Sequence, residues 1–328
     1  MKSMVKVLSI TAVLGWFVAS VPLASAEVLK VDKGVPHYKK VAGISGNLNA
    51  VGSDTMINLM TLWAEGFKKV YSGVTVQVEG KGSATAPPAL TEGSSQLGPM
   101  SREMKPKETD DFEAKHGFKP TRFKVAVDGL GVYVNKDNPI KSLSIVQLDA
   151  IFGKQRKRGA VSNITTWDQA GATGDFAGKP ITMFGRNAAS GTYGYFKEHA
   201  LDKGDYKDEV KEQPGSAAVV QGVTEDKYAI GYSGMGYLTS GVRMISLSSK
   251  DGEPAYSAED PANVYSGKYP LSRYLNLYVS KDPKKGLEPL VKEFLKFVFS
   301  QEGQEITIKD GFMPMLSNAV KAELEKLK

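Results

Sequence analysis

Cysteine is absent from this sequence of 328 residues, and histidine occurs only at His37, His116 and His199. Without cysteine there is no disulfide, no thiolate metal ligand, no cysteine nucleophile and no amino-terminal cysteine for a lipid anchor. Three histidines scattered along the chain also argue against a histidine metal cluster. We therefore expect no metal site of either kind.

The sequence also lacks an apolar run long enough to span a membrane. Residues 7–21 are apolar and follow two lysines, but they fall short of the roughly 20 residues that a spanning helix needs. Small residues at 24–26 offer a cleavage site, so residues 1–26 are typical of a secretory signal peptide, with a membrane anchor as the less favoured alternative. We expect an exported chain that begins at Glu27, and export argues against chemistry with intracellular cofactors such as ATP or NAD.

Charge of one sign is only slightly in excess. The 42 Lys and Arg against 36 Asp and Glu give a formal net charge of +6, and removing the two lysines of residues 1–26 leaves +4. This excess favours anionic ligands but lacks the density of a nucleic-acid binder. A basic run at residues 154–158 has no interleaved aromatics, so we expect a solvated loop there.

Length and patterning indicate two lobes. A chain of 328 residues with 41% hydrophobic residues suggests two domains. From residue 48 onward short β-rich runs alternate with helical patterns, which predicts an α/β protein with a largely parallel sheet. Two long β runs, 123–135 and 269–280, end in the similar texts Val-Tyr-Val-Asn-Lys-Asp and Leu-Tyr-Val-Ser-Lys-Asp, and we interpret them as a pair of crossovers.

The two crossovers divide the chain discontinuously. We expect residues 27–126 and 271–328 to form one lobe and residues 127–270 to form the other. Two lobes joined by two segments can open and close, and a ligand in the cleft is then contacted by loops from both sides.

A strand-to-helix junction at residues 52–55 reads Gly-Ser-Asp-Thr. There, the hydroxyls of Ser53 and Thr55 and the unpaired N–H groups of the helix start can hold an oxyanion. The alternative is an ordinary helix cap, because Ser53 and Asp54 are common cap residue types.

A second junction combines an arginine with a helix start. Arg186 lies four residues before Ser190-Gly191-Thr192, which opens an amphipathic helix. The guanidinium offers a fork of two donors to an oxyanion, and Ser190, Gly191 and Thr192 can present hydroxyls and amides to the same group.

Two further loops also follow strands. Residues 80–83, Gly-Lys-Gly-Ser, permit a turn whose amides and Ser83 converge on an anion, although a plain glycine turn is equally compatible. Ser101 and Arg102 add a hydroxyl and a second guanidinium, although an exposed arginine usually has no ligand. Four such loops are expected where an anion is held at the carboxyl ends of the strands.

These motifs resemble those of the phosphate-binding components of bacterial phosphate ABC importers. The resemblance runs from about Gly46 to the carboxyl terminus and includes Gly-Ser-Asp-Thr, Gly-Lys-Gly-Ser, Met-Ser-Arg, Arg-Asn-Ala-Ala-Ser-Gly-Thr and Ile-Gly-Tyr-Ser. It implies an α/β, two-lobed class II periplasmic-binding-protein fold with mixed sheets flanked by helices and a ligand cleft between the lobes. It also implies a binding protein, not an enzyme, without cofactor or metal.

The resemblance further implies a ligand, a set of site residues and partners. One inorganic phosphate would be bound in the periplasm and delivered to a permease and its ATPase in the inner membrane, by a protein expected to be a monomer without nucleic-acid partners. The residues that match the family's motifs are Ser53, Asp54, Thr55, Ser83, Ser101, Arg102, Arg186, Ser190, Gly191 and Thr192.

The chain departs from the family's pattern at the acid that accepts the phosphate proton. Family members place an aspartate directly after the third-loop serine, where this chain has Arg102, and residues 187–189 also lack the acid found in some relatives. Asp54 is the best substitute. Asp128 is a weaker one, since a turn or hinge role before Gly129 explains it at least as well.

Other hypotheses remain open. An exported phosphoryl-transfer enzyme would use Ser53 or Ser190 as nucleophile, with the arginines stabilising the developing charge. A receptor of the same fold would take arsenate or sulfate, or would capture phosphate without importing it. Release of phosphate from an ester would distinguish the enzyme from the receptors.

Overall fold

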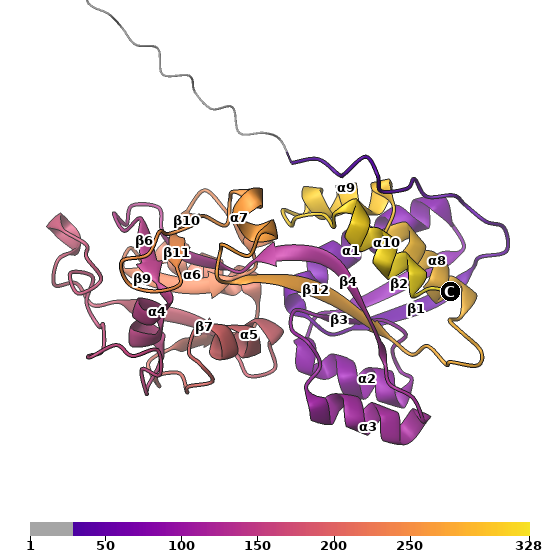
Figure 1. The fold of residues 1–328 in the computed structure, drawn as a ribbon, viewed down its shortest axis with the longest axis horizontal. Coiled ribbons are helices and arrows are strands. Elements are labelled where there is room, and N and C mark those ends of the chain that lie inside the picture. The colour runs from indigo at the N-terminus through magenta and orange to yellow at the C-terminus, as the bar shows by residue number, and fades with distance from the viewer. Residues whose placement is uncertain (1–28) are drawn as a thin grey trace, which may run out of the picture.

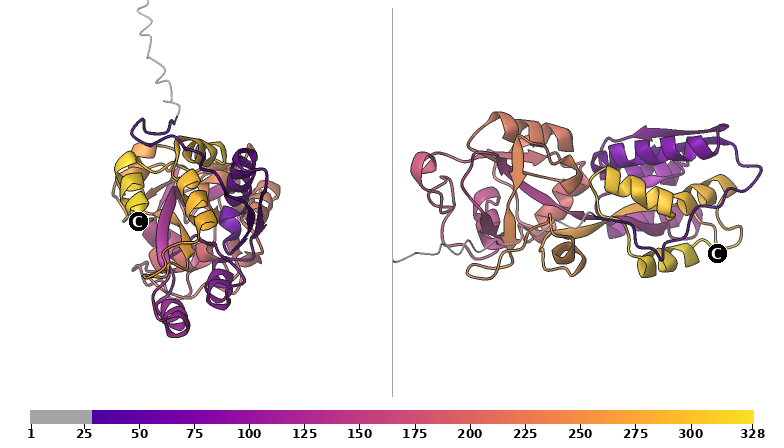
Figure 2. Two further views of the ribbon diagram at one scale, coloured as in Figure 1. Left: turned by 90° about the vertical axis from the view of Figure 1, so that its right-hand side faces the viewer. Right: turned by 90° about the horizontal axis from the view of Figure 1, so that it is seen from above.

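The structure is a computed structural model that describes residues 29–328; the predicted signal peptide lies outside them. Figure 1 shows an elongated molecule of two lobes with strands β4 (Thr121–Gly129) and β12 (Ser272–Val279) running between them. The view from above in Figure 2 shows the same two bodies. Among the described residues no helix is both long and apolar enough to cross a membrane.

Each lobe collects segments that are distant in sequence (Figure 1). The first lobe holds β1 (Gly46–Val51), β2 (Val74–Glu79), β3 (Gly98–Met100), η1 (Asp54–Met56), α1 (Ile57–Val70), η2 (Ser83–Thr85), α2 (Ala86–Glu92), α3 (Pro106–His116), α8 (Pro289–Val298), α9 (Gln301–Lys309) and α10 (Ser317–Glu325). The second holds β5 (Gly131–Asn135), β6 (Ser142–Ser144), β7 (Thr182–Arg186), β8 (Lys211–Gln213), β9 (Ala229–Ser233), β10 (Val242–Met244), β11 (Ser246–Ser248), α4 (Ile145–Phe152), η3 (Gly174–Phe176), α5 (Gly191–His199), α6 (Ser216–Glu225), η4 (Met235–Tyr237) and α7 (Pro261–Tyr265). The boundaries predicted at 126/127 and 270/271 stay predictions.

The sheets are mixed, so the expectation of a largely parallel sheet is wrong. Pairs β1/β2, β6/β11, β7/β8 and β7/β9 are parallel, whereas β5/β9, β5/β10, β3/β12 and β4/β12 are antiparallel. The antiparallel pairs all involve the two long β runs, because the chain enters the second lobe along one run and returns along the other. The predicted pair of crossovers thus forms the β4/β12 ladder.

The helix after β1 shows why the chain folds as its pattern predicts. The apolar residues of α1 recur at helical spacing, and Leu59, Met60, Trp63 and Phe67 are fully buried. The indole N–H of Trp63 donates to the backbone oxygen of Gly303 at 2.8 Å and so ties α1 to α9. This packing fixes the start of α1, where the polar residues of the first predicted loop stand.

The basic run at residues 154–158 forms a loop, as predicted. Lys154 pairs with Asp208 at 2.7 Å, and the Arg158 guanidinium donates to the backbone oxygens of His199 and Ala200 at the end of α5. These contacts give the basic run a structural role within the second lobe.

A close contact between the lobes lies where η4 meets the end of α9 and the predicted loop at residues 52–55. A Cβ at Gly236 would lie 2.5 Å from the backbone oxygen of Asp310, so only glycine fits there. The Tyr237 hydroxyl donates across the cleft to the backbone oxygens of Asp54 (3.0 Å) and Thr55 (3.2 Å). Burial raises the pKa of Tyr237 above its ordinary value, so this hydroxyl remains a donor.

Asp310, beside this contact, should make stability depend on pH. Burial raises the pKa of its carboxyl to about 7, against about 3.9 in an unfolded chain. The folded protein then holds a proton that the unfolded chain has lost, so the stability contributed by this group falls as pH rises from about 4 to about 7. We expect the free energy of unfolding of Asp310→Asn, relative to wild type, to increase between pH 5 and pH 8 in urea denaturation. An identical difference at both pH values would contradict this.

Candidate anion-binding site

Three serines of the first lobe meet at the carboxyl ends of its strands. Ser53 follows β1, Ser83 follows the turn after β2, and Ser101 follows β3. The Ser53 hydroxyl donates to the Ser101 hydroxyl at 3.0 Å, and the Ser83 and Ser101 hydroxyl oxygens are 3.3 Å apart. All three are at most 1% exposed. The structure thus brings together three of the sequence-predicted loops.

The loops at residues 52–55 and 80–83 each had an ordinary structural explanation, a helix cap and a plain glycine turn. Ser53 makes no side-chain cap bond, so the helix-cap interpretation is wrong for its hydroxyl. The Gly-Lys-Gly-Ser turn has its Gly82 at φ +111°, but the Gly82 and Ala84 amides donate to the backbone oxygens of Gly52 (2.8 Å) and Ala189 (3.0 Å). These two hydrogen bonds hold the turn against the loops that contain Gly52 and Ala189. The hydroxyl of Ser83 is the group of this turn that faces the cluster.

The second lobe contributes the start of α5. The Ser190 hydroxyl oxygen caps this helix by accepting from the amides of Thr192 (3.1 Å) and Tyr193 (3.3 Å), which leaves its proton to donate elsewhere. The Thr192 hydroxyl lies 2.8 Å from that of Thr55 in the first lobe. A Cβ at Gly191 would lie 2.2 Å from the Ser83 hydroxyl oxygen, so the two lobes approach here as closely as glycine allows.

Arg186 and Asp54 form a buried ion pair between the lobes. The Arg186 side chain is fully buried, its Nη2 pairs with Oδ1 of Asp54, and its Nη1 donates to the Ser216 hydroxyl at 2.9 Å. Oδ2 of Asp54 accepts from the Ser216 amide (3.0 Å) and hydroxyl (3.2 Å). Within residues 29–328, Nε of Arg186 is buried and has no hydrogen-bond partner. Arg186 therefore has one buried N–H group, at Nε, that is available to a ligand.

Arg102 is not the second guanidinium of this cluster. Its Nη1 and Nη2 form a two-point pair with Glu108 of α3 at 2.7 Å each, and Nη1 also donates to the backbone oxygen of Glu103. The carboxylate of Glu108 satisfies the fork, so the guanidinium is held against α3. Its neighbour Ser101 remains in the cluster.

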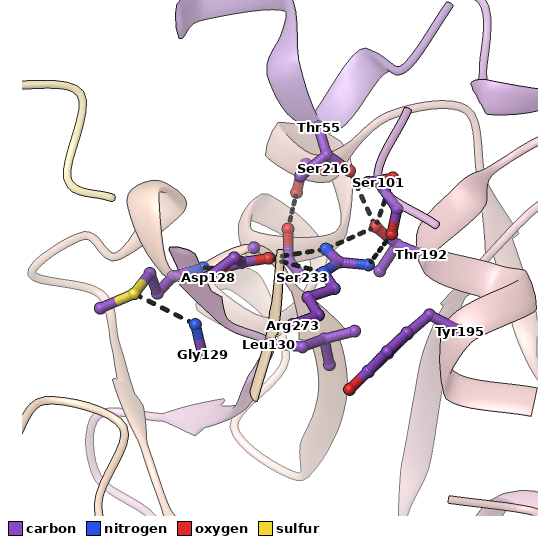
Figure 3. A network of polar contacts seen from close by, with 12 residues as sticks. Thr55, Ser101, Asp128, Gly129, Leu130, Thr192, Tyr195, Ser216, Ser233 and Arg273 are labelled. Carbon is purple, nitrogen blue, oxygen red and sulfur yellow. Dashed lines mark hydrogen bonds and ion pairs between the residues drawn. The ribbon is translucent and has the colours of Figure 1, made fainter. Parts of the chain in front are cut away.

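Arg273 of β12 stands where Arg102 was expected (Figure 3). Its Nη2 donates to the Thr192 hydroxyl at 3.0 Å and its Nη1 to the Ser101 backbone oxygen at 2.8 Å. Its Nε donates to Oδ2 of Asp128, which is fully buried. Asp128 is thus the partner of Arg273, and its Oδ1 also accepts the Met235 amide at 2.9 Å.

Sequence reasoning missed two residues of the cluster, Arg273 and Ser216. Ser216 follows β8 and opens α6 after Pro214-Gly215, the same strand-to-helix pattern as the loops that were recognised, so its signal was present. Arg273 is the one charged residue in the β run 269–280, and a charge in such a run is itself a signal of a buried partner.

The cluster as a whole is a set of hydrogen-bond donors without excess charge. Its buried ionised groups, Arg186, Asp54, Arg273 and Asp128, sum to zero, and hydroxyls supply the other donors. No group of three or more metal-binding side chains occurs in the part of the chain that the structure describes. Such a site suits a small oxyanion enclosed by two lobes.

Two lobes that enclose a buried cluster of oxyanion donors define a ligand-binding protein of the kind that closes around its ligand. A family model described as the PBP superfamily domain matches residues 39–302. The sequence is 50% identical over 322 residues to the phosphate-binding protein PstS of Pseudomonas aeruginosa, covering 98% of this chain and 99% of that protein. The chain therefore belongs to the PBP superfamily and, within it, to the family of that phosphate-binding protein.

Solved structures share the fold. An ABC-type phosphate transport receptor from Vibrio cholerae matches with a TM-score of 0.63 at 23% identity, over 82% of this chain and all of that one. The periplasmic phosphate-binding protein PfluDING, solved with phosphate bound, matches with a TM-score of 0.63 at 14% identity, over 84% of this chain and 92% of that one. The predicted two-lobed class II fold with mixed sheets is confirmed.

Proposed function

We propose that this protein binds one inorganic phosphate between its lobes and delivers it to an ABC permease. The observation that carries the proposal is the buried Arg186, whose Nη1 donates to Ser216 beside the hydroxyls of Thr55 and Thr192 and whose Nε has no hydrogen-bond partner within residues 29–328. The names of its relatives support the same ligand: the 50% identical protein is a phosphate-binding protein, and a structural neighbour is a phosphate transport receptor.

The proposed ligand groups come from both lobes. Phosphate oxygens accept from Arg186, from hydroxyls and from the amide at the start of α5, where the helix dipole also favours an anion. The groups we assign are those of Ser53, Thr55, Ser83, Ser101, Arg186, Ser190, Gly191 and Thr192, with Asp54 as the proton acceptor.

Asp54 is the proposed source of selectivity against sulfate. Each carboxylate oxygen can accept about two hydrogen bonds, and within residues 29–328 Arg186 is the only partner of Oδ1 of Asp54, so this oxygen retains a lone pair for the proton of hydrogen phosphate. Sulfate has no proton at neutral pH and would leave that lone pair facing a negative oxygen. An unmatched buried group costs about 1–3 kcal/mol, which is roughly tenfold or more in affinity. Arsenate, with the same proton chemistry, is discriminated less well.

Calorimetric titration of residues 27–328, stripped of bound ligand, tests both the function and the selectivity. We expect one-to-one binding of phosphate, with sulfate excluded. In Asp54→Asn, the ratio of phosphate to sulfate affinity should fall about tenfold or more. Asp149→Asn is the matched control, since Asp149 is another buried carboxylate, bound to the Arg158 amide in the second lobe. Equal phosphate and sulfate affinity in the wild type would refute the selectivity, and no phosphate binding by the folded protein would refute the function.

A phosphoryl-transfer enzyme is the second candidate, and the geometry disfavours it. An attacking serine needs a positioned base. The nearest carboxylate, Asp54, bonds to Ser216 and pairs with Arg186, while the Ser53 hydroxyl donates to Ser101 and that of Ser190 caps α5. The expected result with a phosphate ester is no release of phosphate under turnover conditions.

The cellular setting belongs to the same proposal. The predicted signal peptide directs the chain to the periplasm, where a monomer would present bound phosphate to the permease and its ATPase. The Vibrio cholerae protein that shares this fold is an ABC-type phosphate transport receptor, and this similarity supports import over mere capture.

A further inference from the structure

Arg273 is one side chain that touches both lobes and both connecting strands. It stands at the start of β12, one residue after the pair Ser272–Gly129 that ends the β4/β12 ladder. From there its fork reaches Ser101 in the first lobe and Thr192 in the second (Figure 3). It is 6% exposed, so these contacts are made without competition from bulk water.

The position of this guanidinium is fixed on every side. Asp128, its partner on β4, accepts from Nε at 2.8 Å and lies 2.7 Å from Nη2. The ring of Tyr195 from α5 lies under the guanidinium (Figure 3). The distance from Cζ of Arg273 to the centroid of this ring is 5.2 Å. A guanidinium whose three nitrogens each have a partner holds a single orientation, and it thereby fixes the groups that it contacts.

We propose that Arg273 is a positioning residue of the anion site, which acts through Thr192 and makes its hydroxyl a donor to the ligand. This inference rests on the proposed phosphate binding. Arg273 sets the direction of the hydrogen bond that the Thr192 hydroxyl donates, and Asp128 holds Arg273 in the position that this requires.

The hydrogen-bonding capacity of a hydroxyl explains the effect. Thr192 has one proton and two lone pairs, and one lone pair is taken by Nη2 of Arg273. A guanidinium has no acceptor for that proton, so the proton points away from Arg273, to the side where the hydroxyls of Thr55 (2.8 Å) and Ser101 (3.5 Å) lie. An oxyanion accepts hydrogen bonds only, so a hydroxyl already directed there binds it without reorientation.

Arg273 does this without adding net charge to the site. Its charge is matched by Asp128, which is fully buried, whereas Arg102 is matched by Glu108 away from the cluster. The contribution to binding is therefore the direction of a donor and not the attraction of a free cation. A lysine at this position would keep the charge and lose the fork.

A double-mutant cycle between Arg273 and Thr192 tests the proposal. Phosphate affinity is measured by calorimetry for wild type, Arg273→Gln, Thr192→Val and the double variant, with thermal unfolding as the check on folding. Each single variant is expected to bind about tenfold more weakly, and the double variant no more weakly than the weaker single one, because both changes remove the same directed donor. Losses that multiply would overturn the proposal, since a merely structural arginine acts independently of the Thr192 hydroxyl.

Arg273→Lys carries the test if Arg273→Gln fails to fold, because lysine keeps an ion pair with Asp128. About tenfold weaker phosphate binding by this variant supports a directed fork, and wild-type binding overturns it. The matched control is Arg122→Gln: Arg122 also links β4 to β12, through Asn276, whose amide donates to the backbone oxygens of Met100 and Arg102, so this variant disturbs the strands beside Ser101 without removing a contact of the Thr192 hydroxyl. If wild type binds phosphate and Arg273→Gln binds equally well, only this inference fails; if wild type does not bind, the proposed function fails.

Discussion

Replacing Arg186 with glutamine is expected to reduce phosphate affinity by a hundredfold or more. The side chain is fully buried and supplies the one charged donor of the second lobe to the cluster, with Nε unpaired in residues 29–328. Losing charge-assisted hydrogen bonds worth about 1.5–3 kcal/mol each from a buried site accounts for a change of that size. Calorimetric titration with phosphate measures it.

The same substitution should also lower stability, because it leaves Asp54 buried without its partner. Breaking a buried ion pair on one side costs about 3–5 kcal/mol. A double variant with Asp54→Asn removes the unpaired charge and is expected to regain part of the free energy of unfolding in urea, without regaining phosphate binding. Phosphate binding of Arg186→Gln within about threefold of wild type would contradict the assignment of this arginine.

Gly191→Ala is the second substitution with a large expected effect. An added Cβ would stand 2.2 Å from the Ser83 hydroxyl oxygen and 2.6 Å from that of Ser101, closer than any real contact. The start of α5 must then move away from the first lobe, which costs about 1–3 kcal/mol of overpacking and displaces two donors worth about 1 kcal/mol each. We expect phosphate affinity to fall about a hundredfold, again by calorimetry.

Gly194 provides the control on the same helix. A Cβ there would come no closer than 3.3 Å, to Cδ of Arg102, so a shift of a few tenths of an ångström accommodates it. Gly194→Ala should therefore leave phosphate affinity unchanged, and it should stabilise α5 by up to about 1 kcal/mol through helix propensity. If both alanine variants bind phosphate equally well, closure of the lobes at Gly191 is not part of binding.

The patterns that predicted the fold correctly are local ones. The β-rich runs and helical patterns that alternate from residue 48 match observed elements such as α1 and β2, because burial of one face selects the period of each pattern. The direction of strand pairing was predicted less well. Parallel or antiparallel pairing depends on how distant segments return, and no local spacing records that the 269–280 run lies against β4.

In the candidate site, too, local motifs were predicted correctly, and contacts between separate segments were not. The structure brings Ser53, Ser83, Ser101 and Thr192 together as their loop motifs predicted, since each stands at a strand end or helix start. In the structure Arg273 and not Arg102 contacts the cluster, and sequence alone does not show that Glu108 in the first turn of the next helix engages Arg102. Which arginine faces the cluster depends on where its carboxylate partner lies, Glu108 for Arg102 and Asp128 for Arg273.

A crystal structure of the mature protein grown with phosphate tests the central claim most directly. The account predicts one phosphate between the lobes, within hydrogen-bond distance of Arg186 and of hydroxyls from both lobes, including those of Ser83 and Thr192. It also predicts that Arg102 still pairs with Glu108. Phosphate bound elsewhere, or bound by Arg102 with Arg186 uninvolved, would contradict the account.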